Sequence, residues 1–527
     1  MATPLKIVEA KTPDGRTERV YADRPKNLNE MLDNTVKKHS GLEGPVDTSD
    51  RLTYRQFASL VNRAASALYH RYGIRKGDRV AIMLRNGVEY LTGFFAAARI
   101  GAINVPLNTA LKGEEMTFQV KDSGASVLIT DYEFHELIAE VRSQIEEVKY
   151  IFVTGEPVAG TVPFSELLKA GQSPTKIKLD EMDSAIILYT SGTTGRPKGA
   201  VLTHKGVIAS AMNNAALCEL RLGQDKMLVV VPLFHVTGLV MAMCSAVFTG
   251  IPVVLVKKFK TADMLKVIAE EKITAMFAVP TILWLMLNAP EFAQHDLSSL
   301  HSFGAGGAAA PEELMRLCAD KLPGLQLMPG YGLTEAVGGV ISTTILKEAL
   351  SRPGTVGRPM PLVDARVVDT SGKDVPPGES GEILLRGCQV MKEYWNNPQA
   401  TRETIVDGWL HTGDIGKITE DGYAYILDRT KDMINRGGEK IYSLEVENLL
   451  YRHPKVLEVA VVGVPDIVFG EQVKAAIVLK PGEQATPEEM QEYCGKYLSY
   501  YKVPKYVEFR ESLPRNPAGK VTKAKLR

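Results

Sequence analysis

The run YTSGTTGRPKG at residues 189–199 combines glycines, small hydroxyl side chains and a lysine directly after the apolar run AIIL. Glycines and hydroxyls after a strand can turn backbone N–H and side-chain OH groups toward an anion, and Lys198 adds a positive charge. This is the chemistry of a phosphate-binding loop. A Walker A loop has the spacing GxxxxGK[ST], whereas Lys198 lies between Pro197 and Gly199, so the run disfavours an ordinary P-loop NTPase.

The surrounding sequence predicts an α/β fold that would hold this loop. Apolar runs such as RVAIML and ASVLIT alternate with helical patterns such as VEYLTGFFAAARI, which predicts α/β layers with largely parallel sheets. From about Thr355, short strands and turns predict a small β-rich subdomain, and from about Asp428 a compact α+β unit follows, in which Ser443 can cap a helix. We predict a large N-terminal domain, residues 1–428, with two α/β layered sheets and the β-rich subdomain, and a smaller mobile α+β domain, residues 429–527.

Length, charge and cysteine usage limit the classes of function. A chain of 527 residues exceeds what one core usually supports, so two to four packed units are expected. Lys plus Arg and Asp plus Glu both number 62, so no net field attracts the chain to nucleic acid or an anionic membrane. Five dispersed cysteines without a CxxC pair argue against a disulfide framework or zinc cluster, which favours a reducing, cytoplasmic compartment. The N-terminus lacks the apolar segment of a signal peptide.

One uncharged stretch, residues 227–256, is long enough to cross a membrane. However, Pro232, Gly238, Gly250 and Pro252 divide it into short segments. A buried strand, helix and strand is therefore predicted there, without integral membrane association.

Six motifs occur in a specific order along the chain. They are YTSGTTGRPKG at 189–199, PLFHVTG at 232–238, YGLTEA at 331–336, WLHTGD at 409–414, DRTKDMINRGGE at 428–439 and PRNPAGK at 514–520. Together they resemble the adenylate-forming superfamily of acyl-CoA synthetases, peptide-synthetase adenylation domains and beetle luciferases, over nearly the whole chain. The resemblance implies an acid:CoA ligase that makes an acyl adenylate from ATP and a carboxylic acid, then transfers the acyl group to coenzyme A with release of AMP and pyrophosphate.

The resemblance also implies a site for ATP and Mg²⁺. Thr334 resembles the contact to the α-phosphate and Glu335 the Mg²⁺ ligand, since a hard cation prefers carboxylate oxygen together with phosphate. The implied cofactor-binding residues are Thr190, Ser191, Gly192, Thr193, Thr194 and Lys198 for the β- and γ-phosphates, Gly306, Gly307, Tyr331 and Gly332 for adenine, and Asp414 and Arg429 for the ribose.

The C-terminal unit is implied to serve both half-reactions. Lys520 matches the catalytic lysine that bridges carboxylate and phosphate during adenylation, so it should matter for the first step and little for the second. Gly437 and Gly438 match glycines that line the pantetheine tunnel after the small domain rotates, and Lys431 occupies the hinge position. By composition alone, a charged surface loop is the commoner origin of the segment around Lys431.

His235 indicates which acids fit. It occupies the place where amino-acid-adenylating relatives carry an aspartate for the substrate ammonium, so an α-amino acid would leave a buried cation unpaired. His235 also resembles the family's residue that lies between the acyl pocket and the thioester tunnel. The acyl pocket is expected to draw on His235, Val236, Thr237, Ala305, Gly306, Gly307, Val337, Gly338 and Gly339. This mostly small, apolar lining suits an uncharged aliphatic, alicyclic or aromatic tail.

Three alternatives remain open at this stage. The adenylate could pass to a carrier protein, although the GGE sequence and the lack of a downstream carrier domain count against this. The chain could be a catalytically silent nucleotide-binding regulator, against which the intact Lys198, Glu335, Asp414 and Lys520 count. It could also be a luciferase-like oxygenase. The expected partners are a small carboxylic acid, ATP and coenzyme A, without nucleic acid, and a homodimer is allowed.

Overall fold

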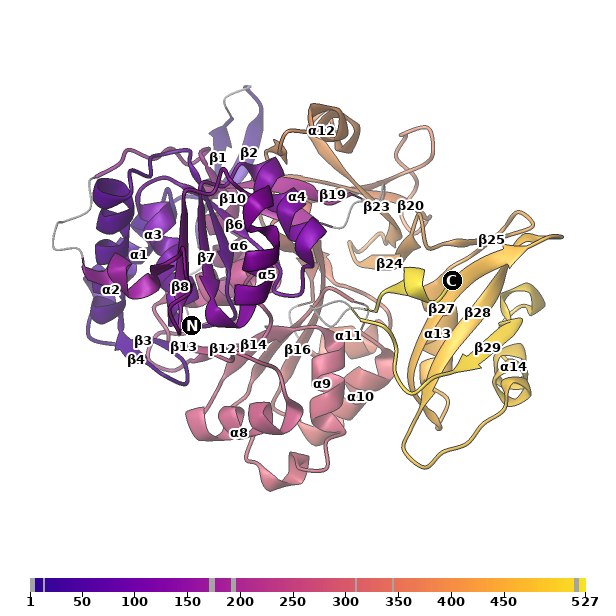
Figure 1. Cartoon of the computed structure of the whole chain (residues 1–527). Helices are drawn as coiled ribbons and strands as arrows, with labels where there is room; N and C mark the ends of the chain where they lie inside the picture. Colours follow the sequence, from indigo (N-terminus) through magenta and orange to yellow (C-terminus); the bar gives the residue numbers. More distant parts are fainter. Residues whose placement is uncertain are drawn as a thin grey trace.

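The computed structural model describes residues 5–12, 15–169, 176–190, 196–308, 310–343, 346–515 and 521–527. Its N-terminal part contains two large sheets with their helices, and a smaller β-rich sheet separates part of this body from the C-terminal unit (Figure 1). The predicted α/β fold, with a large N-terminal part and a smaller α+β unit, is confirmed.

An eight-stranded sheet carries the first half of the chain. Its order is β21 (Glu393–Tyr394), β11 (Lys198–Thr203), β10 (Ser184–Thr190), β6 (Ile103–Pro106), β5 (Arg79–Met83), β7 (Val127–Asp131), β8 (Tyr150–Thr154) and β9 (Val162–Pro163). The strands from β10 to β9 are parallel, and β11 and β21 are antiparallel additions at one edge. Strands such as β7 read as continuous apolar runs because helices cover both faces of a parallel sheet. The helices of this half include α2 (Tyr54–Ser66), α3 (Val88–Arg99), α4 (Gly113–Ser123) and α5 (His135–Val141).

A nine-stranded sheet forms the second layer. Its order is β18 (Arg358–Pro359), β17 (Gly338–Ser342), β16 (Gln326–Leu333), β15 (Ser302–Ala305), β14 (Ala275–Ala278), β12 (Met227–Val229), β13 (Val253–Leu255), β3 (Glu43–Val46) and β4 (Arg51–Thr53). Six consecutive strands from β16 to β3 are parallel. Helix α6 (His204–Leu217) is buried along almost its whole length, and it contacts both β10 of the first sheet and β17 of the second.

The uncharged stretch 227–256 folds as predicted. It forms β12, a helical segment made of η5 (Thr237–Cys244) and α7 (Ser245–Thr249), and then β13. In the parts of the chain that the structure describes, no helix combines the length and apolarity needed to cross a bilayer.

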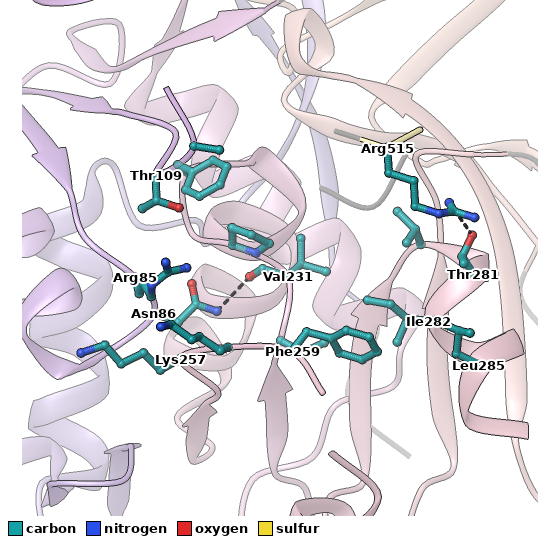
Figure 2. Close-up of a pocket in the computed structure, with 16 residues that line it drawn as sticks. Arg85, Asn86, Thr109, Val231, Lys257, Phe259, Thr281, Ile282, Leu285 and Arg515 are labelled. Carbon is teal, nitrogen blue, oxygen red and sulfur yellow. Dashed lines mark hydrogen bonds between the residues drawn. The ribbon is translucent and has the colours of Figure 1, made fainter. Parts of the chain in front are cut away.

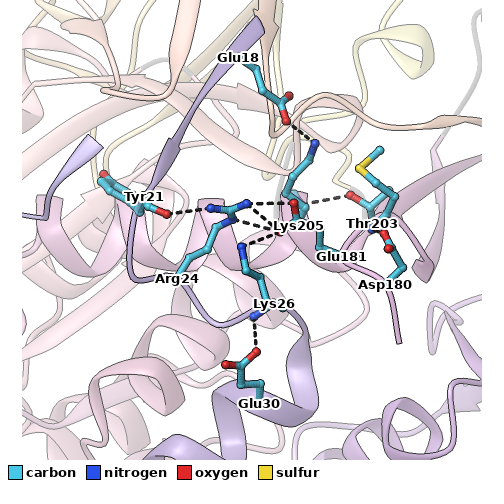
Figure 3. Close-up of polar contacts among 11 residues, drawn as sticks. Glu18, Tyr21, Arg24, Lys26, Glu30, Asp180, Glu181, Thr203 and Lys205 are labelled. Atoms are coloured by element: carbon cyan, nitrogen blue, oxygen red, sulfur yellow. Dashed lines mark hydrogen bonds and ion pairs between the residues drawn. The ribbon is translucent and has the colours of Figure 1, made fainter. Parts of the chain in front are cut away.

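The N-terminal hairpin is attached to α6 by an ion pair (Figure 3). Strands β1 (Ile7–Lys11) and β2 (Thr17–Tyr21) form this hairpin, and Glu18 of β2 pairs with Lys205, a lysine that is only 5% exposed. Next to this pair, Nη2 of Arg24 donates to both carboxylate oxygens of Glu181, at 2.9 and 2.8 Å. A buried lysine is tolerated only when paired, so Glu18 fixes the start of α6.

Two smaller sheets complete the fold. The β-rich sheet consists of β19 (Val363–Val368), β20 (Gly381–Gly387), β22 (Ile405–Val406), β23 (Trp409–Ile418) and β24 (Ala424–Arg429). The C-terminal unit has β25 (Ile434–Arg436), β26 (Glu439–Ile441), β27 (Val456–Asp466), β28 (Gly470–Leu479) and β29 (Tyr506–Phe509), with helices α13 (Ser443–Tyr451) and α14 (Pro487–Gly495).

The predicted cap of α13 was wrong by one residue. Tyr442 is the cap residue, and Ser443 is already the first residue of the helix. The Ser443 backbone N–H donates to Oδ2 of Asp428 (2.6 Å), so the acceptor at this helix start comes from β24. An external carboxylate satisfies the N-terminal donor as a capping side chain would.

Candidate active site

The run predicted to bind phosphate connects two antiparallel strands whose ends lie side by side. Strand β10 ends at Thr190 and β11 begins at Lys198, and these two residues pair in the antiparallel register. Ser191, Gly192, Thr193 and Thr194 lie outside the described residues, and so does Lys520. Thr190 Oγ1 donates to Oε1 of Glu335 (3.2 Å), which brings the first residue of the run to the expected metal ligand.

A strained turn directs Glu335 toward that hairpin. Strand β16 continues into one short turn of helix, Thr334–Ala336, and Val337 follows with φ at 54°. This conformation is unfavourable for a β-branched residue and costs about 1–3 kcal/mol. Burial of Val337 and a 2.7 Å hydrogen bond from Ser210 Oγ to its carbonyl hold the turn. The chain then reverses into β17, which pairs antiparallel with β16.

Tyr394 is a site residue that the sequence analysis missed. Its OH donates to Oε1 of Glu335 (2.8 Å), and its ring centroid lies 5.2 Å from Nζ of Lys198. Burial, and then the Glu335 carboxylate, raises the pKa of Tyr394, so the phenol stays a donor at neutral pH. The sequence signal was weak, because residue 394 is 59 positions from Glu335 and reaches it only through the pairing of β21 with β11.

The Glu335 carboxylate fits a hard cation. Two neutral donors, Thr190 and Tyr394, hold Oε1, while among the described residues no protein donor contacts Oε2. Within the same residues there is no cluster of three or more His, Cys, Asp or Glu side chains that could form a complete protein metal site. Mg²⁺ commonly binds through one or two carboxylates together with substrate phosphates, so a single oriented glutamate beside a phosphate loop suits it.

Tyr331, Asp414 and Arg429, the residues predicted to bind the nucleoside, contact one another. Tyr331 OH donates to Oδ2 of Asp414 (2.6 Å), and Arg429 Nε lies 3.1 Å from Oδ1. Asp414 and Arg429 are register partners in β23 and β24, and Tyr331 comes from β16. Burial, and then the Asp414 charge, raises the pKa of Tyr331 well above its usual value. Since β16 leads directly to Glu335, one segment joins the nucleoside half to the phosphate half.

The glycines beside Tyr331 are constrained in different ways. A Cβ added at Gly332 would lie 1.9 Å from the Gly338 carbonyl oxygen, so only glycine fits where β16 and β17 approach each other. Gly306 and Gly307 follow β15 and are at least partly open to solvent, and Gly307 has φ at +80°. The Gly306 N–H donates to the Ala278 carbonyl of β14 (3.2 Å), and a Cβ at Gly306 would lie 3.5 Å from the Gly330 carbonyl oxygen of β16, so this glycine lies close to both neighbouring strands.

His235 lies at the start of the helical segment that backs the acyl region. In the described part of the chain its buried Nε2 has no hydrogen-bond partner. Burial lowers the pKa of His235 to about 4, so the imidazole is neutral at pH 7. A shielded and unpaired ring nitrogen is available to a ligand.

Three of the predicted acyl-pocket residues, Val236, Gly338 and Gly339, are grouped with Met241, which the sequence analysis also missed. A Cβ at Gly338 would meet Met241 Cγ at 2.9 Å and Val236 Cγ2 at 3.5 Å, and a Cβ at Gly339 would meet Met241 Cε at 3.0 Å. Thr237 begins the same helical segment as Met241. Ala305 ends β15 and is buried, and no described contact joins it to this group. The flexible Met241 side chain occupies the space that the two glycines leave.

A cleft of about 480 Å³ is lined by Phe234, the residue that precedes His235 in the chain, and by residues of several other elements (Figure 2). Its apolar wall includes Pro232, Phe234, Phe259, Ile282 and Leu285, and its cationic residues are Arg85, Lys257, Lys258 and Arg515. Arg515 comes from the C-terminal unit, and its Nη1 donates to Thr281 Oγ1 (3.4 Å). The C-terminal unit therefore reaches this cleft through Arg515.

The C-terminal unit presents its glycine pair elsewhere. Gly437 and Gly438 are exposed in the turn between β25 and β26, where the Gly437 N–H donates to the Phe469 carbonyl (2.8 Å). The structure does not bring them to His235. Lys431 lies in the turn between β24 and β25, so it connects the β-rich sheet to the C-terminal sheet, and its carbonyl accepts from Arg527 (3.0 Å).

Known proteins identify the family. The family described as AMP-binding enzyme matches residues 32–395, and the AMP-binding enzyme C-terminal domain matches residues 445–520. The chain belongs to the AMP-binding enzyme family. It is 38% identical over 507 residues to the long-chain-fatty-acid--CoA ligase FadD13 of Mycobacterium tuberculosis, covering 95% of this chain and 98% of the relative. It is 40% identical over 479 residues to a feruloyl-CoA synthase of Amycolatopsis sp, covering 90% and 93%.

A solved structure agrees with these relatives. The anthranilate CoA ligase AuaEII in complex with anthranoyl-AMP superposes with a TM-score of 0.88 at 30% identity, over 95% of this chain and 96% of that one. The predicted class is therefore confirmed: this AMP-binding enzyme is an ATP-dependent, AMP-forming acid:CoA ligase.

Proposed function

We propose that this site activates a carboxylic acid that has an uncharged tail and no α-amino group, using ATP and Mg²⁺, before transfer to coenzyme A. One observation carries the proposal: Glu335 faces Thr190 and Lys198 on one side, and the same segment carries Tyr331, bound to Asp414, on the other. A phosphate-binding cation, an oriented carboxylate and a ribose acceptor thus line one continuous site.

The residues divide the work of the first step. The attacking carboxylate and the α-phosphate are both anionic, so cations and oriented donors are the main requirement. Lys198 and the hairpin bind the β- and γ-phosphates, Thr334 contacts the α-phosphate, and Asp414 accepts from the ribose hydroxyls. When bound to Glu335 and the phosphates, Mg²⁺ supplies further positive charge to them. Lys520 is proposed to bridge the carboxylate and phosphate.

The acid is proposed to lie between His235 and the Val236, Gly338 and Gly339 group. No charged side chain belongs to this group, so a second carboxylate or an α-ammonium would lose hydration without gaining a partner. The relatives support this class: FadD13 is named for long-chain fatty acids, and the Amycolatopsis enzyme for feruloyl-CoA. An aliphatic, alicyclic or aromatic acid is therefore the proposed substrate.

The observed arrangement is proposed to be the adenylating one. Arg515 lines the cleft, whereas Gly437 and Gly438 are exposed and do not line it. We propose that residues 1–428 bind ATP and the acid, and that residues 429–527 rotate about Lys431 to bring Gly437 and Gly438 to the pantetheine path for the second step. The five cysteines are free and buried, which supports a cytoplasmic location. A homodimer remains a prediction that light scattering would test.

Coenzyme-A-dependent AMP formation tests the proposal across straight-chain, branched, alicyclic and aromatic acids with Mg²⁺ and ATP. One acid class should support turnover, Lys520→Ala should abolish it, and Lys525→Ala, an exposed lysine in the same segment, should not. Starting from the synthetic acyl adenylate, Lys520→Ala should still form the thioester. If no acid releases pyrophosphate, the regulator alternative is favoured. Transfer to a carrier protein in preference to coenzyme A, or light from luciferyl adenylate, would favour the other two alternatives.

A further inference from the structure

Tyr394 lies between two groups of opposite charge that have different tasks. Its OH donates to Oε1 of Glu335 at 2.8 Å, and Lys198 Nζ lies 5.2 Å from the centroid of its ring. Tyr394 is 7% exposed, whereas its two partners are half-buried. A hydrogen bond to a charged acceptor is stronger than one between neutral groups, and a cation over an aromatic ring is attracted by it.

The backbone around Tyr394 is held at three points. Tyr394 pairs with Ala200 across β21 and β11, its N–H donates to Thr401 Oγ1 (2.9 Å), and the next N–H, of Trp395, donates to the Gly199 carbonyl (2.7 Å). In addition, the Met391 N–H donates to the main-chain carbonyl of Glu335 (2.7 Å). The tyrosine ring therefore has a fixed position relative to both the hairpin and Glu335.

This arrangement affects the charges of Lys198 and Glu335. Within the described residues Lys198 forms no ion pair, although it lies over the ring of the tyrosine whose OH donates to Glu335. A direct Lys198–Glu335 ion pair would neutralise the cation needed by the phosphates and the carboxylate needed by the metal. A phenol that hydrogen bonds to one and stacks under the other prevents this pairing without adding a charge.

We propose that Tyr394 is a positioning residue that orients the Glu335 carboxylate for Mg²⁺ and keeps Lys198 apart from it. The inference rests on the proposed function, because Glu335 is the metal ligand only if that proposal holds. Tyr394 touches neither the acid nor ATP in this role; it acts through Glu335 and Lys198.

Mn²⁺ provides a direct readout in place of Mg²⁺. Binding of Mn²⁺ and ATP to the protein is measured by electron paramagnetic resonance for the wild type, Tyr394→Phe, Glu335→Gln and the double variant, alongside urea unfolding. We expect Tyr394→Phe to weaken Mn²⁺ binding about tenfold, the loss typical of one hydrogen bond to a charged group. In the Glu335→Gln background the same substitution should change binding little, because the group it positions is gone.

Tyr54→Phe is the matched control, since Tyr54 is fully buried and its OH donates to the Ile251 carbonyl (2.7 Å), away from the site. It should lower stability without changing Mn²⁺ affinity. Wild-type Mn²⁺ affinity in Tyr394→Phe, or an equal loss with and without Glu335, would overturn the inference. If the wild type itself neither binds Mn²⁺ with ATP nor exchanges pyrophosphate with any acid, the proposed function fails, and this inference fails with it.

Discussion

Removal of the Lys523 charge should weaken the C-terminal unit by a predictable amount. Lys523 Nζ lies 2.7 Å from Glu447 Oε1 and donates to Ser443 Oγ (2.6 Å), whose backbone N–H donates to Asp428. Loss of one partner of a buried ion pair costs about 3–5 kcal/mol, and the side-chain exposures of 20% for Lys523 and 10% for Glu447 reduce this to about 2–3 kcal/mol for Lys523→Met.

Hydrogen exchange at the Val461 amide measures this cost locally, because that N–H donates to Glu447 Oε1 (2.8 Å). If β27 exchanges by opening of the C-terminal unit, its exchange should accelerate about 30-fold to 150-fold. Lys455→Met is the control: Lys455 pairs with Glu489 at 2.8 Å, but both side chains are about one-third exposed, so the expected loss is below about 1 kcal/mol.

The pH dependence gives a second readout. Burial raises the pKa values of Glu447 and Asp428 in the folded state. The folded state therefore loses stability relative to the unfolded state as the pH rises above the usual carboxyl range and these groups ionise. Without Lys523 this cost increases, so Lys523→Met should lose more stability at pH 8 than at pH 5.5. An Lys523→Met loss no larger than that of Lys455→Met, or one independent of pH, would refute the reasoning.

Three further predictions concern the site. Burial lowers the pKa of His235 from 6.5 to about 4, so the wild type should lose about 2–3 kcal/mol of stability between pH 7 and 4.5. Urea unfolding of His235→Gln should not show this loss. Parallel pH profiles of stability for the two proteins would contradict the prediction. Asp414→Asn removes the charge that pairs with Arg429, so AMP affinity by calorimetry should fall at least about tenfold, and unchanged affinity would exclude the ribose role. Met241→Ala should shift the ratio of kcat/KM values toward bulkier acids at a stability cost of about 2–4 kcal/mol; an unchanged acid preference would place the tail elsewhere.

The sequence by itself determined the layering of the fold. Alternating apolar and helical runs are local signals, and they correctly predicted the parallel sheets, the β-rich sheet, the α+β unit and the strand, helix and strand of residues 227–256. The ordered motifs likewise indicated the family, since each is a short contiguous run. Charge balance and scattered cysteines needed no tertiary information either.

Only the tertiary structure decided which side chains share the site. Thr190 and Glu335 are 145 positions apart, and Tyr394 reaches Glu335 because β21 joins the edge of a sheet whose strand order no local pattern specifies. The same limit explains the misplaced cap of α13, where Asp428 of another element supplies the acceptor. It also explains why Met241 was overlooked: a methionine in an apolar helix looks like any core residue until two glycines of β17 are packed against it. Periodicity encodes elements, whereas contacts between elements depend on how the sheets assemble.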